Sequence, residues 1–462
     1  MRVSSSWCTL VALLGTFTMV STPVWGAGFA LQEQSVSSLG RAFSNGSVGT
    51  GDASTVFFNP AGFADLEDGS NLNIGINQIL VTFEFENDGS TNNFPPSAPS
   101  PIAGGDGGNA GQDATVPYVH YVYKMGDMGF GVGIYSPYGL STKYKDDFVG
   151  RFHGLESGIT TININPSFSY TITPEFTVGV GLNVQTLSAI LTKAVDVGAA
   201  CYAGAYEQAF IQARQAGQDE TAAATTAATA AQNNCGTLIN AKAEGTAEVT
   251  GDSTGYGFNI GFLYDLGETK IGLTYRSGIE HNIDGKAKYK DVANLIEDTD
   301  AKTSVSIPAT ASLGVAHEFG DAGVSFDILY TQWSVLDELK FEFDSDQDDS
   351  IEKFEWENAM KYSLGGHYRV MPELDLRFGL ALDQSPIQET EKRGVRLPDT
   401  DRTWMTLGSG YDLGGVEINF AYAYLALGDA KVERLTEGED KLVKGEYEGS
   451  IHIVGLDVAA NF

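Results

Sequence analysis

The stretch LDLRFGLALD, from Leu374 to Asp383, alternates apolar side chains with polar or small ones. Successive side chains of a strand point to opposite sides, so this stretch would have one apolar face and one small or charged face. The same alternation recurs in FTVGVGLNVQ at 176–185 and in EINFAYAY at 417–424. The pattern predicts an all-β protein whose strands each turn one side toward apolar surroundings.

The connections between the predicted strands are of two kinds. Tight turns lie at 126, 173, 267, 320, 371 and 414, and long polar loops at 87–114, 145–157, 194–246, 287–301, 344–354, 388–401 and 428–446. Six turns and seven loops separate fourteen strands. Short turns at one end and long loops at the other are typical of outer-membrane barrels. We therefore predict a 14-stranded antiparallel transmembrane β-barrel over residues 69–462, whose largest extracellular loop is 194–246.

The two ends of the chain favour the membrane over a soluble β-sandwich, which would also alternate. Residues 1–26 read as a signal peptide, with an apolar run from Trp7 to Val20 that is too short to span a membrane. The chain ends in VGLDVAANF, an alternating strand closed by Phe462. We expect Sec-type export and location in the bacterial outer membrane. The formal net charge of −32 argues against a nucleic-acid partner.

Two cysteines remain after the predicted signal peptide, Cys201 and Cys235. In an oxidising compartment they would form one disulfide, and two free thiols are the alternative. The loop between them is rich in alanine and favours helix.

Residues 27–68 show no strand alternation and are rich in small polar side chains, so we predict that they form a plug, or hatch, inside the barrel. They contain STVFFNPAGFADL, in which an Asn-Pro-Ala turn lies among phenylalanines. The predicted third strand contains GVGIYSPYGLSTKY, where Pro137 has no N–H to donate to a neighbouring strand. The ladder should be interrupted there, as a bulge or as an opening.

In several motifs the sequence resembles the FadL-type long-chain fatty acid transporters of the bacterial outer membrane. The motifs are AGFALQEQSVSSLGRAFSN at 27–45, FFNPAGF at 57–63, YSPYGLSTKY at 135–144, LTYRSGI at 273–279, YTQWSVL at 330–336, DQSPI at 383–387 and LPDTDRTWM at 397–405. The resemblance implies passive uptake of hydrophobic compounds by a monomer. Long-chain fatty acids are the leading candidate substrates, and aromatic or aliphatic hydrocarbons are the alternative. The resemblance also implies that the substrate leaves sideways into outer membrane lipid.

The resemblance assigns two groups of residues to this exit. The gate, which is part of the hatch, comprises Phe57, Phe58, Asn59, Pro60, Ala61 and Phe63. The lateral opening comprises Ser136, Pro137, Tyr138 and Gly139. In the family the Asn-Pro-Ala turn faces the bend in the third strand, and we expect the same contact here.

The substrate-binding candidates are inward-facing apolar side chains and lumen cations: Lys193, Arg276, Leu329, Lys361, Trp404, Leu425, Ile451 and Ile453. Any of them could instead pack against the plug. Lys193 falls near one basic position of the family, but the second is matched by acidic or neutral residues around Glu357 and Asn358. This difference leaves room for neutral substrates.

The acidic stretch DSDQDDSIEKFE has the spacing of a calcium loop, and a solvated acidic loop is the alternative. The ligand positions are Asp344, Asp346, Asp348, Ser350, Glu352 and Glu355, but Asp349 replaces the usual glycine. We predict no cofactor apart from this possible structural calcium. No catalytic motif is present, so we predict that the protein is not an enzyme. A lipid hydrolase using His452 lacks a matched serine, and a general porin is disfavoured by the plug.

Overall fold

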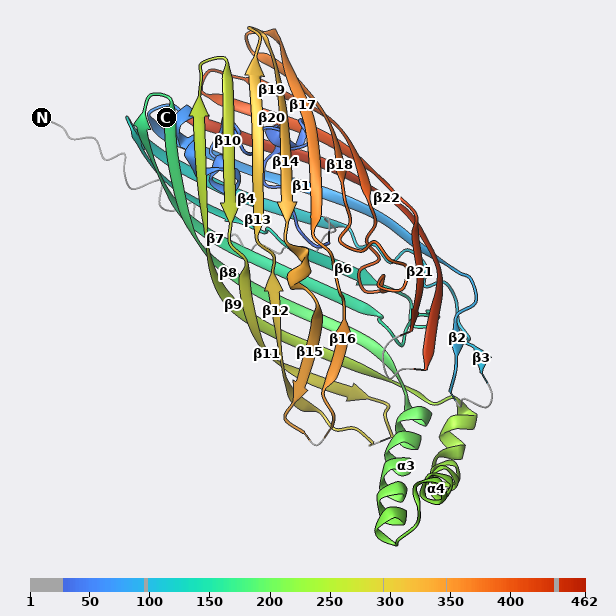
Figure 1. The fold of residues 1–462 in the computed structure, drawn as a ribbon. Helices are drawn as coiled ribbons and strands as arrows, with labels where there is room; N and C mark the ends of the chain where they lie inside the picture. The colour runs from blue at the N-terminus through green and yellow to red at the C-terminus, as the bar shows by residue number, and fades with distance from the viewer. Residues whose placement is uncertain (1–27, 95–98, 294, 346, 436–439) are drawn as a thin grey trace, which may run out of the picture.

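The computed structural model describes residues 28–94, 99–293, 295–345, 347–435 and 440–462, so the predicted signal peptide lies outside the described residues. The chain forms a closed antiparallel barrel of fourteen strands, as predicted (Figure 1). The strands, several of them in two parts, are β1 (Gly69–Asn87), β4 (Ala114–Met125), β5 (Met128–Tyr135) with β6 (Gly139–Lys143), β7 (Glu156–Thr173), β8 (Phe176–Asp196), β9 (Glu244–Asp265), β10 (Thr269–Arg276) with β11 (Ile279–Lys290), β12 (Thr299–Ile307) with β13 (Thr310–Glu318), β14 (Ala322–Thr331) with β15 (Glu338–Phe343), β16 (Ser350–Lys353) with β17 (Ala359–Met371), β18 (Leu374–Asp383), β19 (Arg402–Asp412), β20 (Val416–Leu427) with β21 (Ala430–Leu435), and β22 (Lys441–Asn461).

The barrel closes between β1 and β22, which pair from Asn71 opposite Asn461 to Asn87 opposite Gly445. A short pair, β2 (Thr91–Asn92) and β3 (Ser100–Pro101), extends the sheet beside β22. The break between β14 and β15 contains a short 3-10 helix, η3 (Trp333–Val335).

The alternation in β18 points its apolar face outward. Leu380 is 56% exposed, whereas its neighbour Ala381 is 3% exposed. Arg377 and Asp383, on the same side as Ala381, are buried. Exposed large apolar side chains recur on strands all around the wall. Within the apolar belt, the small or charged face of the strand therefore lines the lumen, and the apolar face suits lipid.

Several strands continue into stretches predicted as loops. Most of the predicted loop at 428–446 belongs to β21 and β22, and β16 lies within the predicted loop at 344–354. These predictions were wrong because the ladder extends beyond the apolar belt. Beyond this belt the outward side chains become charged, as Lys431 and Glu433 do in β21, while Ala430 and Val432 are buried on the inner face. The outward apolar alternation that marks a membrane strand is therefore lost, although the pairing continues.

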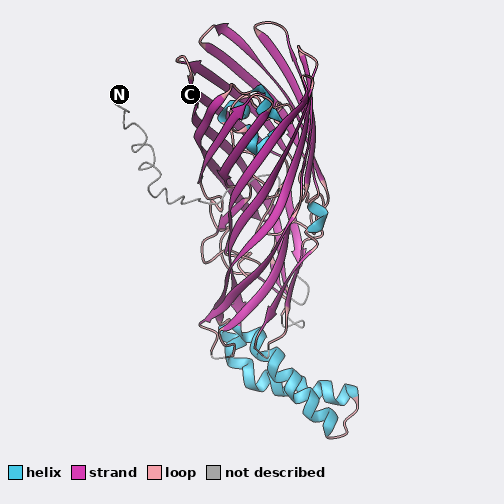
Figure 2. Cartoon of the chain, turned by 90° about the vertical axis from the view of Figure 1, so that its left-hand side faces the viewer, coloured by secondary structure: helices cyan, strands magenta, loops and turns pink. Residues whose placement is uncertain are grey.

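The N-terminal segment, residues 28–68, contains three short helices, α1 (Val36–Leu39), α2 (Thr55–Phe58) and η2 (Pro60–Asp65). Figure 2 shows short helices within the barrel, near the end where the C-terminus lies. The Val36 N–H donates to the Tyr118 hydroxyl at 2.9 Å, and the Ser47 N–H donates to the Asp327 carboxylate at 3.1 Å. Polar side chains of the wall thus satisfy backbone groups of this segment.

Glycines in the wall allow the N-terminal segment to come this close. A Cβ at Gly272 would lie 1.8 Å from the Ser47 carbonyl oxygen, and a Cβ at Gly379 would lie 2.3 Å from the Arg41 carbonyl carbon. Any larger residue at these positions would displace the segment or the strand.

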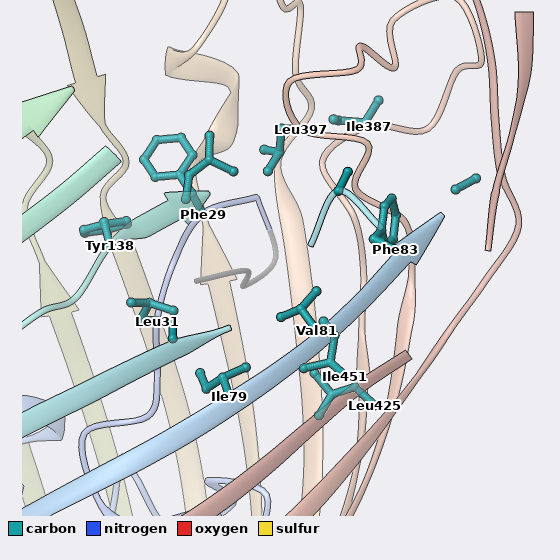
Figure 3. Close-up of a cluster of buried hydrophobic side chains, with 14 of the residues drawn as sticks. Phe29, Leu31, Ile79, Val81, Phe83, Tyr138, Ile387, Leu397, Leu425 and Ile451 are labelled. Carbon is teal, nitrogen blue, oxygen red and sulfur yellow. The ribbon is translucent and has the colours of Figure 1, made fainter. Parts of the chain in front are cut away.

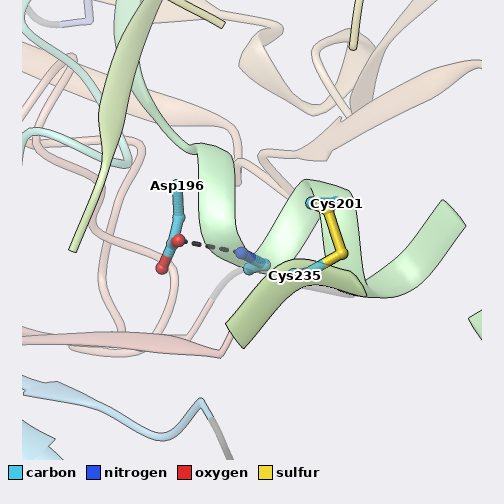
Figure 4. Close-up of a disulfide and its surroundings, with 4 residues drawn as sticks. Asp196, Cys201 and Cys235 are labelled. Carbon is cyan, nitrogen blue, oxygen red and sulfur yellow. Dashed lines mark hydrogen bonds between the residues drawn. A yellow bond between two sulfur atoms is a disulfide. The ribbon is translucent and has the colours of Figure 1, made fainter. Parts of the chain in front are cut away.

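The long connection between β8 and β9 is a helical hairpin, α3 (Val197–Gln215) and α4 (Glu220–Ala241), that projects from the opposite end of the barrel (Figures 1 and 2). Asp196 caps α3 by accepting from the Ala199 N–H at 2.9 Å, and a disulfide joins Cys201 to Cys235 (Figure 4). Among the described helices, none is both long and apolar enough to cross a membrane.

Removal of this disulfide should loosen the hairpin and leave the barrel intact. A crosslink across a separation of 34 residues stabilises the closed loop by about 3 to 4 kcal/mol in the chain-entropy account. We expect the variant with Cys201→Ala and Cys235→Ala to be cleaved by protease within 197–241, while the barrel keeps its heat-resistant migration on a gel. Equal protease resistance in the variant, or two reactive thiols in the unfolded, unreduced native protein, would contradict this expectation.

Candidate functional site

The ladder of the third barrel strand breaks between Tyr135 and Gly139. β5 pairs with β7 as far as Tyr135, and β6 resumes the pairing at Gly139. Within the break, the Tyr138 N–H donates to the Thr161 hydroxyl at 3.1 Å, and this hydroxyl donates to the Tyr138 carbonyl at 2.7 Å. The interruption lies at Pro137, where the sequence predicts it, and a side chain of β7 satisfies part of the freed backbone.

The beginning of the N-terminal segment covers the other edge of this break. The Leu31 N–H donates to the Pro137 carbonyl at 2.8 Å, and the Gly139 N–H donates to the Phe29 carbonyl at 2.9 Å. The Gln34 side chain adds a hydrogen bond to the Ser136 carbonyl at 2.6 Å. The chain around Phe29 to Leu31 therefore acts as a short extra strand beside the bend.

The prediction that the Asn-Pro-Ala turn contacts the bend was wrong. Asn59 caps η2 through its side chain, which accepts from the Ala61 N–H at 2.9 Å, and Pro60 is the first residue of that helix. The turn packs on β8 and β9, where a Cβ at Gly179 would lie 2.3 Å from the Ala61 nitrogen and a Cβ at Gly261 would lie 1.9 Å from the Asn59 side-chain oxygen. These two glycines fix the position of the turn. They lie on β8 and β9, whereas the bend lies between β5 and β6.

The phenylalanines around the turn have different surroundings. Phe57 stacks edge-on against Tyr135, the last residue before the bend, with ring centroids 5.0 Å apart. Phe58 packs on Phe57 and lies 5.9 Å from Phe43. Phe63 is fully buried against the strand that precedes the bend. Of the predicted gate residues, Phe57 is thus the one in ring contact with the strand at the edge of the break.

A first cavity, with an empty volume of about 850 Å³, lies in the half of the lumen near the long loops. Its lining is almost entirely apolar and includes Leu140, Leu187, Leu191, Ile283, Val305, Leu339 and Phe341. Arg396, the inward cation among its lining residues, is paired with Glu352 at 3.2 Å. Figure 3 shows part of the surrounding apolar cluster, which spans the N-terminal segment, the wall and the loops.

A second cavity, of about 760 Å³, lies behind the bend. Pro137 and Tyr138 line it together with Phe57 and Phe58, and so do polar side chains of the wall. The linings of the two cavities meet at aromatic rings, because Phe29 lines the first cavity and Tyr138 lines the second. Phe29 lies 4.9 Å from Trp333 and 5.9 Å from Tyr138 between ring centroids.

Four of the predicted substrate contacts line cavities near the N-terminal segment. Arg276 and Leu329 line the second cavity. Leu329, Lys361 and Trp404 line a third cavity of about 400 Å³, where the Lys361 ammonium stands 3.8 Å from the Trp404 ring centroid. Glu33 lines this third cavity too. Burial raises the pKa of its carboxyl group to about 7, although a hydrogen bond from its own backbone N–H and the charge of Lys361 both lower this pKa.

The remaining candidates do not line these three cavities. Leu425, Ile451 and Ile453 are buried in the apolar cluster near β1, and Lys193 is half-buried near the end of β8. Sequence reasoning also missed the lining of the first cavity. The available signal was in β8, where the inward positions after Gln185 change from polar to Leu187, Ala189 and Leu191.

The predicted calcium positions do not gather into a site among the described residues. Asp346 lies outside the described residues, Glu352 pairs with Arg396, and Asp349 pairs with Lys340 at 2.8 Å. Within the described ranges, no group of three or more His, Cys, Asp or Glu side chains is arranged to hold a metal ion. Calcium binding stays a prediction.

Together, the barrel, the apolar cavity and the broken wall strand define an outer-membrane transport barrel. Residues 17–462 match the family described as Outer membrane protein transport protein (OMPP1/FadL/TodX), so the chain belongs to this family. It is an outer membrane transport protein and not an enzyme.

Individual relatives cover almost the whole chain. The long-chain fatty acid transport protein of Escherichia coli strain K12 is 29% identical over 443 residues, which are 90% of this chain and 92% of that protein. Outer membrane protein P1 of Haemophilus influenzae is 26% identical over 410 residues, 86% of each chain.

Solved structures show the same fold. A FadL homologue of Pseudomonas aeruginosa superposes with a TM-score of 0.80 at 21% identity, covering 94% of this chain and 100% of that one. The Pseudomonas putida toluene transporter TodX superposes with a TM-score of 0.63 at 19% identity, with coverages of 94% and 100%.

Proposed function

We propose that this protein takes up long-chain fatty acids passively and releases them sideways into the membrane at the bend between β5 and β6. The first cavity receives the alkyl chain, and the second cavity leads it to Pro137. The observation that carries this proposal is the second cavity, because it is lined by Pro137 and Tyr138 of the interrupted wall strand. The fatty acid transport proteins among the relatives support the choice of substrate.

The energetics of an alkyl chain favour such a route. Each methylene exposed to water costs about 0.8 kcal/mol, so a chain in an apolar cavity would resist release into the aqueous periplasm. Release into lipid avoids this cost. The nearly complete apolar lining of the first cavity supports the first half of this route.

The N-terminal segment closes this exit through the chain around Phe29 to Leu31. A membrane wall cannot leave backbone groups unsatisfied toward lipid, and here the chain around Phe29 to Leu31 bonds the backbone at Pro137 and Gly139. Movement of this piece away from the bend would open the wall. Phe57, which packs against Tyr135 at the edge of the bend, would border the opening.

Aromatic or aliphatic hydrocarbons are the second candidate substrates. The observation that favours them is Arg396, whose pairing with Glu352 leaves the first cavity without an uncompensated inward cation among its described lining. A cavity of this kind accepts a neutral ligand as readily as an alkyl chain.

Uptake into cells distinguishes the two substrates. The protein would be produced in a bacterial strain that lacks its own fatty acid transporter, and uptake of labelled palmitate and labelled toluene would be measured with and without it. We expect palmitate uptake to depend on the protein. Toluene uptake that depends on the protein, with no change for palmitate, would reverse the order of the two candidates. No effect on either compound would reject the proposal.

A further inference from the structure

We infer that Arg276 binds the carboxylate of the substrate, beside the exit. The inference rests on the proposed function and narrows its substrate class to monocarboxylic amphiphiles. Arg276 ends β10 and is the cation among the described residues that line the second cavity. Its site is thus the cavity that reaches Pro137, rather than the apolar first cavity.

Arg276 lacks a carboxylate partner among the described residues, unlike many other lumen arginines. Arg377 pairs with Asp375 and Glu417, Arg402 with Asp383, and Arg396 with Glu352. Arg276 instead donates to neutral oxygens: the Tyr135 hydroxyl at 3.2 Å, the Asn183 side chain at 2.6 Å and the Phe57 carbonyl at 2.6 Å. A half-buried cation with only neutral partners attracts an anion strongly, because little water is present to screen it.

The guanidinium also has donors left for a ligand. Of its five N–H groups, three are used in these hydrogen bonds, and Nε–H is among those that bond to no described residue. The edge formed by Nε and Nη2 is one that can bind a carboxylate with two parallel hydrogen bonds. Asp327, the carboxyl group among the cavity's described lining residues, accepts from the Ser47 N–H at 3.1 Å.

The contacts of Arg276 place a bound head group between the gate and the bend. Its guanidinium lies 5.0 Å from the ring centroid of Phe57, in the N-terminal segment, and 5.9 Å from that of Tyr135, at the end of β5. Arg276 thus touches both sides of the proposed exit. A carboxylate bound here would have its alkyl chain next to the break in the wall.

The test compares two ligands of one chain length, palmitate and hexadecan-1-ol, binding at equilibrium to the purified full-length protein. Arg276→Gln removes the charge and should weaken palmitate binding by about ten- to a hundredfold, the range of a charge-assisted hydrogen bond. Hexadecan-1-ol affinity should stay within about twofold of the native protein. Arg276→Lys keeps the charge and should retain most palmitate affinity. Arg369→Gln, an exposed arginine near a tight turn, controls for loss of charge alone.

Equal weakening of both ligands in Arg276→Gln, or unchanged palmitate binding, would overturn the inference. A second measurement uses the native protein alone and stays informative if the variant does not fold. Ionisation of palmitate as the pH rises should increase its affinity relative to hexadecan-1-ol, and a constant ratio would contradict the site. If the native protein binds neither ligand, the proposed function fails, and this result is distinct from the loss of the carboxylate site alone.

Discussion

Gly272→Val should push the N-terminal segment away from the barrel wall and open the lumen to ions. Gly272 lies on β10, and a Cβ there would be 1.8 Å from the Ser47 carbonyl oxygen. Ser47 is held in turn by Asp327 and by the hydroxyl of Ser312 at 2.6 Å. The segment cannot keep these contacts with an added side chain in the way, because the overlap is with backbone and not with a movable side chain.

Single-channel conductance in a planar bilayer measures this effect. We expect the native protein to conduct little and Gly272→Val to show openings at least about tenfold more frequent, since losing two hydrogen bonds costs about 1 to 3 kcal/mol. Leu273→Val, a change at the neighbouring lipid-facing position, is the matched control and should behave as the native protein does. Low conductance in Gly272→Val, with unchanged protease resistance of residues 28–68, would show that the segment tolerates the added side chain.

Much of the barrel could be predicted because the membrane imposes a simple pattern. In β18 every second residue faces lipid, so the alternation from Leu374 to Asp383 identifies both the strand and its orientation. Pro137 was equally informative, because a residue without an N–H cannot complete a ladder. The sequence could not show that the wall continues past the apolar belt into β21, where Ala430 and Val432 are buried and charged side chains such as Lys431 and Glu433 take the exposed face.

The site was harder to predict because it depends on which strands lie opposite one another across the lumen. The position of the Asn-Pro-Ala turn depends on Gly179 and Gly261, which are neighbours because β8 pairs with β9 in the register that places them opposite each other. Many inward positions of this barrel are glycine, so the presence of a glycine alone does not indicate that the position contacts the N-terminal segment. Arg276 was a candidate from its inward phase, but its lack of a carboxylate partner could be recognised only from its three-dimensional contacts.

Closing the wall at the bend is the most direct test of lateral exit. Pro137→Val with Gly139→Thr restores an N–H donor and adds two side chains that favour extended strand. We expect about two ladder hydrogen bonds to form, each worth about 0.5 to 1.5 kcal/mol. The population of the conformation in which the wall is open at the bend should then fall by about tenfold or more. The two cavities would remain, because most of their lining comes from other strands and from the N-terminal segment.

The measurement compares equilibrium palmitate binding with the rate of palmitate uptake in this double variant, after gel migration has shown that the barrel is folded. Lateral exit predicts that binding stays within about twofold of the native protein while uptake slows by about tenfold or more. Uptake at the native rate, in a variant whose structure shows a continuous ladder from β5 through β6, would contradict lateral exit and indicate passage straight through the lumen.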